Sequence, residues 1–252
     1  LNIADSRTMT VSKYNCSTSL PFALPNATIT LTLTAGTFQC ASLVFTSNAP
    51  LALYTCSNNT ITLTGATPSG LLWMSFNVAN YFSVRSDNYL AINITGPAPS
   101  YYAVGTATAK VSLTPDNQTF TINNYNTTFN APTHFTFAET TVTITNNNLH
   151  IFTITLPQDL QTSTATAVVS ANSATTLTNY SITANTILLS LYGPLNINLT
   201  NLTNPVKYLG STLWTITATD NANNPSSAGS ATHTPFYTPT IASASILLSN
   251  SV

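Results

Sequence analysis

Hydrophobic and polar residues alternate along most of the chain, with Thr as the commonest polar partner. Runs such as ATITLTLTAG (27–36) and LHIFTITL (149–156) place an apolar side chain at every second position. A period of two is the side-chain period of a β-strand, and β-branched Thr, Ile and Val favour strands. Helical periodicity is absent. The pattern therefore predicts an all-β chain.

The alternating segments are short and are separated by turn residues. We expect strands at 27–36, 37–46, 51–56, 59–65, 71–78, 81–86, 88–96, 107–113, 118–122, 133–137, 140–145, 149–156, 166–170, 186–193, 195–200, 212–220 and 245–249. Many short strands at even spacing are typical of β-sandwiches and jelly rolls. The strongest predicted hairpin joins 140–145 to 149–156 through three consecutive Asn residues.

A Gly- and Pro-containing stretch, GPAPS at 96–100, interrupts the strand pattern. Such a break predicts a domain boundary. We expect an N-terminal strand at 1–14 and two β-sandwich domains, Ig-like or jelly-roll-like, at 15–98 and 99–252.

The first residues form an alternating strand that nothing nearby folds back, because no Gly or Pro precedes Pro21. We therefore expect residues 1–13 to pair with another copy of the protein as a donor strand. Four side chains would enter successive pockets of that copy: Leu1, Ile3, Met9 and Val11. The start at Leu1, without Met, predicts a mature chain from which a signal peptide has been removed.

Asp5 and Arg7 interrupt the apolar face of this predicted donor strand, and they either pair with each other or mark where it leaves the groove. The C-terminal segment 241–250 is a competing donor, but Pro239 and the preceding turn favour its folding back as a last strand.

Charged residues are scarce: they make up 4% of the 252 residues, against 48 Thr, 29 Asn and 26 Ser. A soluble domain usually has about 25%. With a net charge of −1, nucleic acid and anionic membranes are excluded as partners, and no apolar run is long enough to span a bilayer. A surface of hydroxyls and amides is nearly indifferent to pH, which favours an exported protein from an acidic or harsh environment. The alternative is the compositional bias of a low-charge genome.

Three cysteines fit an oxidising compartment. If a turn centres on Asn48 in the SNAP sequence, Cys40 and Cys56 lie opposite each other on adjacent strands and form a disulfide. Cys16 is then left over. The rival pairing of Cys16 with either partner would tie the N-terminal segment to the first domain. No Cys/His cluster suggests zinc.

Nine N-x-S/T sequons are candidate N-glycosylation sites. They lie at Asn15, Asn26, Asn58, Asn93, Asn117, Asn126, Asn179, Asn198 and Asn201. Covalent glycans would supply the solubility that charge does not. Asn198 and Asn201 are so close that both together are not expected to be filled.

No catalytic residue is predicted, and we expect no enzyme, no cofactor, no metal and no small-molecule substrate. The imidazoles of His134, His150 and His233 accompany no catalytic motif, and the first two fall at strand positions. Trp73 and Trp214 lie in apolar strands. This predicts that both are core residues and do not line a sugar-binding face.

Three acids have structural interpretations. Asp116 and Asp220 fall in turn sequences, where Asx turns account for them. Glu139 is in phase with core-facing Phe residues and either ends its strand or promotes an isopeptide bond between a Lys and an Asn. Lys110 has the right place in sequence for that bond, but its phase predicts a solvent-facing side chain.

The low charge, the Thr- and Asn-rich strands, the sequons throughout and the N-terminal segment LNIADSRTMTVS resemble the thread filament subunit of thermoacidophilic archaea. That family is similar to chaperone–usher pilins in assembling by donor-strand complementation. The resemblance implies a glycosylated cell-surface filament, a head-to-tail homopolymer that serves adhesion or biofilm formation.

Two other functional classes fit the composition. An S-layer or viral coat protein would bury the N-terminal segment in its own subunit. A carbohydrate-binding module or hydrolase would need a cleft with exposed aromatic side chains or paired acids.

Overall fold

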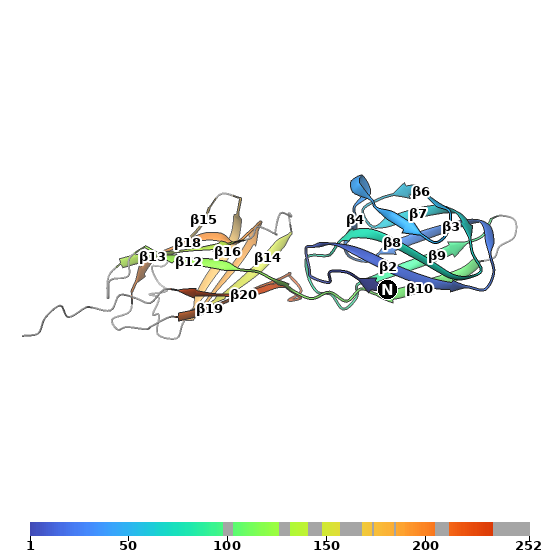
Figure 1. Cartoon of the computed structure of the whole chain (residues 1–252). Helices are drawn as coiled ribbons and strands as arrows, with labels where there is room; N and C mark the ends of the chain where they lie inside the picture. The colour runs from blue at the N-terminus through green and yellow to red at the C-terminus, as the bar shows by residue number, and fades with distance from the viewer. Residues whose placement is uncertain are drawn as a thin grey trace, which may run out of the picture.

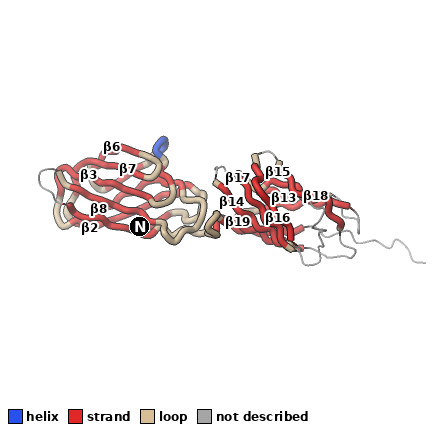
Figure 2. Tube along the Cα trace, turned by 180° about the vertical axis from the view of Figure 1, so that it is seen from behind, coloured by secondary structure: helices blue, strands red, loops and turns tan. Residues whose placement is uncertain are grey.

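The protein consists of two all-β domains that lie end to end, each a sandwich of two sheets (Figures 1 and 2). The computed structural model describes residues 1–97, 103–125, 132–140, 148–156, 168–172, 174–183, 185–204 and 212–233. Each sandwich has its own hydrophobic core between its sheets.

The described part of the first domain contains ten strands and a short 3-10 turn, Cys40–Ser42. The strands are β1 (Asn2–Ile3), β2 (Val11–Leu20), β3 (Leu24–Leu33), β4 (Thr37–Phe38), β5 (Phe45–Ser47), β6 (Leu51–Cys56), β7 (Thr60–Thr67), β8 (Gly70–Ala79), β9 (Tyr89–Thr95) and β10 (Ala103–Lys110). One sheet has the order β1-β2-β8-β4, with β5 also on β8, and the other has the order β10-β9-β3-β7-β6.

The second domain contains the remaining described strands. These are β11 (Asp116–Asn117), β12 (Phe120–Asn124), β13 (Pro132–Glu139), β14 (Leu149–Thr155), β15 (Val168–Ala171), β16 (Thr176–Thr183), β17 (Thr186–Tyr192), β18 (Asn196–Thr203), β19 (Thr212–Thr219) and β20 (Pro225–His233). The sheet orders are β11-β20-β19-β14-β17-β16 and β12-β13-β18-β15.

The predicted alternation of faces accounts for both cores. Along β3, Ile29, Leu31 and Leu33 are buried, and the Thr residues between them lie on the outer face. In the second domain Phe135 and Phe137 of β13 pack against Trp214, with ring centroids 5.3 Å apart in each case. Burying these large side chains supplies most of the stabilisation of each sandwich.

The boundary between the domains lies later in the chain than predicted. β10 pairs with β9 along its whole length, and Val111 and Leu113 complete the first core. The first domain therefore runs to about residue 113, and the boundary at 98/99 is wrong. The GPAPS sequence at 96–100 joins two neighbouring antiparallel strands, and Gly and Pro mark such a connection as readily as a linker.

The donor-strand prediction for the N-terminal segment is wrong, because residues 1–13 lie in their own subunit. β1 pairs with β2, placing Asn2 opposite Asn15, and β2 pairs with β8 along ten residues. The four expected pocket residues do not share one face: Leu1 and Val11 are exposed, Ile3 packs against the first core and Met9 against the second.

The chain returns through a polar loop, residues 4–10, that contains neither Gly nor Pro. Met9 adopts the left-handed conformation, with φ of 62°, that such a turn commonly assigns to Gly. This return also reverses the alternation, so that Ser12 and Tyr14 face the core while Val11 is 61% exposed.

Several strand predictions also need correction. Segment 37–46 is two short strands around the 3-10 turn, and 81–86 is a loop. β14 pairs with β17 and with β19. The predicted hairpin partner at 140–145 lies, apart from its first residue, outside the described residues. Residues 141–147, 205–211 and 234–252 lie outside the described residues.

The predicted disulfide between Cys40 and Cys56 is confirmed, with a Cα–Cα distance of 5.7 Å, and Cys16 is free and buried. The predicted pairing of the two adjacent strands is wrong, because the strands on either side of the SNAP sequence, β5 and β6, belong to opposite sheets. The bond instead ties the 3-10 turn after β4 to the end of β6, and so links the two sheets of the first domain.

Removing this bond is expected to destabilise the first domain. The double variant Cys40→Ser, Cys56→Ser should lose about 3 kcal/mol of unfolding free energy, because a closed loop of about 15 residues limits the unfolded chain. Denaturant unfolding with and without reductant measures the loss. A wild-type protein that is equally stable in both conditions would contradict the prediction.

Candidate functional site

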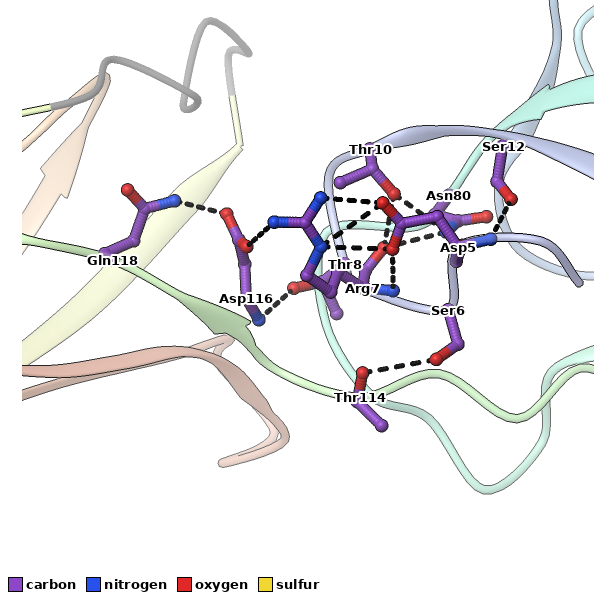
Figure 3. A network of polar contacts seen from close by, with 10 residues as sticks. All are labelled: Asp5, Ser6, Arg7, Thr8, Thr10, Ser12, Asn80, Thr114, Asp116 and Gln118. Carbon is purple, nitrogen blue, oxygen red and sulfur yellow. Dashed lines mark hydrogen bonds and ion pairs between the residues drawn. The ribbon is translucent and has the colours of Figure 1, made fainter.

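The N-terminal loop, residues 4–10, lies in a network of polar contacts that includes Asn80, Asp116 and Gln118 (Figure 3). The Asp5 carboxylate accepts hydrogen bonds from the backbone N–H of Arg7 at 3.0 Å and from its guanidinium at 2.7 to 3.2 Å. The predicted pairing of these two residues is confirmed. The Arg7 guanidinium lowers the pKa of Asp5 below its usual value.

Asn80 holds this loop on the first domain. Its buried amide donates to the carbonyl oxygens of Asp5 and Arg7 at 2.8 and 2.7 Å. Its side-chain oxygen accepts a hydrogen bond from Tyr14 Oη at 2.8 Å, and its backbone N–H donates to Thr10 O. A single side chain therefore binds both ends of the turn and anchors them to the core-facing side of β2.

The loop also contacts the second domain. The Thr8 hydroxyl, fully buried, donates to Ser226 O at 2.5 Å and accepts the backbone N–H of Asp116 at 2.9 Å. The Arg7 guanidinium lies 3.6 Å from the buried Asp116 carboxylate, which Gln118 also contacts. Met9 packs against the second core. We call these contacts, with those made by Phe82, Ser83 and Val84, the domain joint.

The loop after β8 supplies the second half of the domain joint. Ser83 Oγ donates to Asp220 Oδ2 at 2.7 Å, and the N–H of Val84 donates to Pro225 O at 2.8 Å. The Phe82 ring meets His150 edge-on at 5.2 Å. Buried, satisfied hydrogen bonds in two separate loops favour a fixed relation between the domains over a flexible hinge.

Asp220 forms the predicted Asx turn. Its Oδ1 accepts the backbone N–H groups of Ala222 and Asn224 at 2.8 and 2.9 Å. Burial alone would raise the pKa of this carboxyl, but hydrogen bonds from Asn224 and Ser83 outweigh burial and lower it. Asp116, by contrast, lies in β11 and faces Arg7 across the domain joint, so the turn interpretation is wrong there.

A hollow of about 550 Å³ lies beside the domain joint, between the first domain and Asn148 of the second. Its lining includes Met9, Tyr81 and Phe82, and every lining residue is uncharged.

Two buried groups of the second domain titrate far from their usual values. Burial raises the pKa of Glu139 to about 7, with a lowering contribution from the N–H of Leu195 and a raising one from Asp116. Burial lowers the pKa of His150 to about 4, against the attraction of Asp220. His134, by contrast, is exposed and stacks on Tyr125, with centroids 3.9 Å apart.

These groups do not form a catalytic constellation. Glu139 ends β13, one of the two interpretations made from sequence, and Lys110 is exposed at the end of β10 in the first domain, not at the start of the second. Among the described residues, no three His, Cys, Asp or Glu side chains gather as metal ligands. No helix in the described part of the chain is long and apolar enough to cross a membrane.

The two tryptophans differ in burial. Trp214 is fully buried, as predicted, whereas Trp73 is 42% exposed and its predicted core position is wrong. Trp73 lies on the outer face of β8, because Leu72, Met74 and Phe76 fill the inner face.

Most of the candidate glycosylation sites point to solvent. The exposed side chains are those of Asn15, Asn26, Asn58, Asn93, Asn117, Asn179 and Asn201. Asn198 is half-buried and exchanges two amide hydrogen bonds with Asn172, at 3.2 and 2.9 Å. Asn126 lies outside the described residues. Of the neighbours Asn198 and Asn201, Asn201 is therefore the more accessible acceptor.

No pattern in the sequence marks Thr8, Asn80 and Ser83 as joint residues. Thr8 falls within the segment predicted as a donor strand, and Ser83 within a strand predicted at 81–86 that does not form. The role of the Thr8 hydroxyl becomes visible only in the folded structure, where it contacts Ser226, more than 200 residues away in the sequence.

Comparison with known proteins gives no family. No family model and no curated protein matches the chain. The type II cohesin dyad of the adaptor ScaA scaffoldin from Acetivibrio cellulolyticus is similar at 8% identity, with a TM-score of 0.25, covering 88% of this chain and 93% of that one. The serine-rich repeat protein Srr2 from Streptococcus agalactiae is 8% identical, with a TM-score of 0.26, covering 93% of this chain and 88% of that one. TM-scores this low carry no argument about function.

Replacing Thr8 by Val keeps the shape of the side chain but removes the hydroxyl that spans the domain joint. We expect Thr8→Val to lose about 2 kcal/mol of unfolding free energy, because Ser226 O and the N–H of Asp116 lose a buried partner. Thr8→Ser keeps the hydroxyl and is the control. Equal stability of the two variants in denaturant unfolding would contradict this role.

Glu139 and His150 are expected to make stability nearly independent of pH. Glu139, raised from 4.5 to about 7, contributes stability below pH 4.5 that is lost as the pH rises to 7. His150, lowered from 6.5 to about 4, contributes stability above pH 6.5 that is lost as the pH falls to 4. Each effect is worth about 3 kcal/mol, and the two have opposite signs.

Glu139→Gln should reveal the pH dependence of stability that His150 alone produces. We expect this variant to lose about 3 kcal/mol of unfolding free energy between pH 7 and pH 4, while the wild type changes by less than about 1 kcal/mol. His150→Gln is the matched variant and should gain stability on the same acidification. Denaturant unfolding at both pH values measures all three, and parallel profiles would refute the compensation.

Proposed function

We propose that this protein is a structural subunit of an extracellular, N-glycosylated filament, in which copies join head to tail into a rod. The observation that supports this proposal best is the domain joint. Two sandwiches are fixed end to end by buried hydrogen bonds from Thr8 and Ser83, which suits a long, stiff building block.

An extracellular location is supported by the disulfide between Cys40 and Cys56, since such bonds persist in oxidising environments. The exposed sequons and a surface of Thr, Ser and Asn support glycosylation. Few groups titrate, so that the assembly would tolerate an acidic environment.

The N-terminal segment is paired in its own sheet, so a joining strand must come from elsewhere. We propose the segment 241–250, IASASILLSN, the alternative donor that the sequence offers, which lies outside the described residues. A strand added to a sheet edge gains main-chain hydrogen bonds and fills pockets with alternate side chains. Contact between unlike ends is heterologous and produces an open filament.

A second candidate is an S-layer or coat subunit that assembles into a lattice. The specific observation in its favour is the N-terminal segment, which lies within its own subunit as expected for that class. Lateral contacts between rods would then replace the head-to-tail contact.

Negative-stain electron microscopy of the full chain, purified from a glycosylating host, tests the proposal. We expect filaments one subunit wide, and we expect deletion of 241–252 to leave single particles because the joining strand is lost. Deletion of residues 1–3, which removes β1 alone, is the control and should still polymerise.

The other outcomes separate the donor segment, the filament and the lattice from one another. Filaments formed by the 241–252 deletion would refute the donor segment but not the filament. Two-dimensional arrays of the full chain would favour the lattice candidate, and persistent monomers at high protein concentration would refute both.

A further inference from the structure

The outer face of β2 and β8 carries a hollow of about 490 Å³ whose most prominent side chain is a tryptophan. Trp73 is 42% exposed and Leu71, two residues earlier, is 59% exposed. Asn15 and Ser17 of β2 line the same hollow, with Leu1 at its rim. A large, half-exposed aromatic side chain beside an apolar neighbour commonly marks a surface that something covers.

The strand register places a sequon against this tryptophan. Asn15 pairs with Ser75, and Ser17, the hydroxyl residue of the same sequon, pairs with Trp73. Since Ser75 and Trp73 are two residues apart, Asn15 and Trp73 lie on the same face as diagonal cross-strand neighbours, roughly 7 Å apart. The attachment point of a glycan is thus itself one of the residues that line the hollow.

The backbone beneath the tryptophan is held on both sides. β2 pairs with β8 along one edge, and on the other Asn48 Oδ1 accepts the N–H of Trp73 at 3.0 Å. The Asn48 amide also donates to Leu71 O at 2.8 Å. Asn48 directly follows β5, which pairs with β8 up to Met74, so its side chain extends this pairing past Trp73 and the indole is presented from a rigid base.

We propose that the glycan carried by Asn15 folds back onto Trp73 and occupies this hollow. A pyranose ring has a face of C–H groups that packs on an indole, while its hydroxyls hydrogen-bond to polar neighbours such as Asn2 and Ser17. The attached sugar is the occupant because its anchoring amide lies in the hollow, and covalent attachment gives it a high effective concentration. The inference rests on the glycosylation included in the proposed function.

The two tryptophans provide a direct readout, because Trp214 is fully buried and fluorescence quenching by acrylamide reports mainly on Trp73. Protein from a glycosylating host is compared with Ser17→Ala, which removes the Asn15 sequon and retains Asn15. We expect quenching to be about twofold stronger in Ser17→Ala, because a sugar covering one face of the indole removes about half of its accessible area.

Two matched variants control for the substitution itself. Ser17→Thr preserves the sequon and should quench like the wild type. Ser181→Ala removes the Asn179 sequon on β16 of the second domain, and it should also leave the quenching unchanged. Mass spectrometry of the Asn15 peptide establishes whether the site carries sugar.

An unmodified Asn15 would overturn the inference, and so would a modified Asn15 with equal quenching in wild type and Ser17→Ala. Protection of Trp73 only on addition of free oligosaccharide would also overturn it and would indicate a carbohydrate-binding site instead. If sugar is present on other sequons but not on Asn15, this inference fails while the glycosylated filament stands.

Discussion

The arrangement of the first sheet and the joint between the domains both depend on the Asn80 amide. Its hydrogen bonds to the carbonyls of Asp5 and Arg7 close the N-terminal loop. Once closed, the loop sets β1 beside β2 and directs Thr8 toward Ser226 of the second domain. A buried side chain with all of its polar atoms satisfied can fix such a turn without Gly or Pro.

The domain joint is polar because loops of the first domain meet the ends of β11, β14 and β20 of the second domain, not the face of a sheet. Loops and strand ends expose backbone N–H and carbonyl groups, which must find partners when they are buried against each other. Short hydroxyl side chains such as Thr8 and Ser83 reach these groups with little loss of side-chain entropy. Hydrogen-bond geometry, rather than apolar area, therefore sets the register of the two sandwiches.

Sequence reasoning predicted the strands whose two faces differ in polarity, such as β3, β14 and β19. It missed β20 and all of β2 beyond residue 14, because small or polar residues such as Ser12 and Ser226 are buried near the domain joint and interrupt the alternation of apolar residues. The joint itself was not predictable, because its contacts, such as that of Ser83 with Asp220, join residues far apart in the sequence. The disulfide was predicted from spacing, although the bond crosses between sheets rather than between paired strands.

The N-terminal loop has a mechanical consequence when the two domains are pulled apart. The polypeptide enters the second domain near Thr114, and Arg7 lies beside that residue in a parallel bridge, with hydrogen bonds from Thr8 N to Thr114 O and from Thr114 N to Ser6 O. Because the bridge runs alongside the connecting segment, tension loads these bonds together in shear instead of opening them one at a time. The loop thus acts as a non-covalent strap that shares force with the covalent chain.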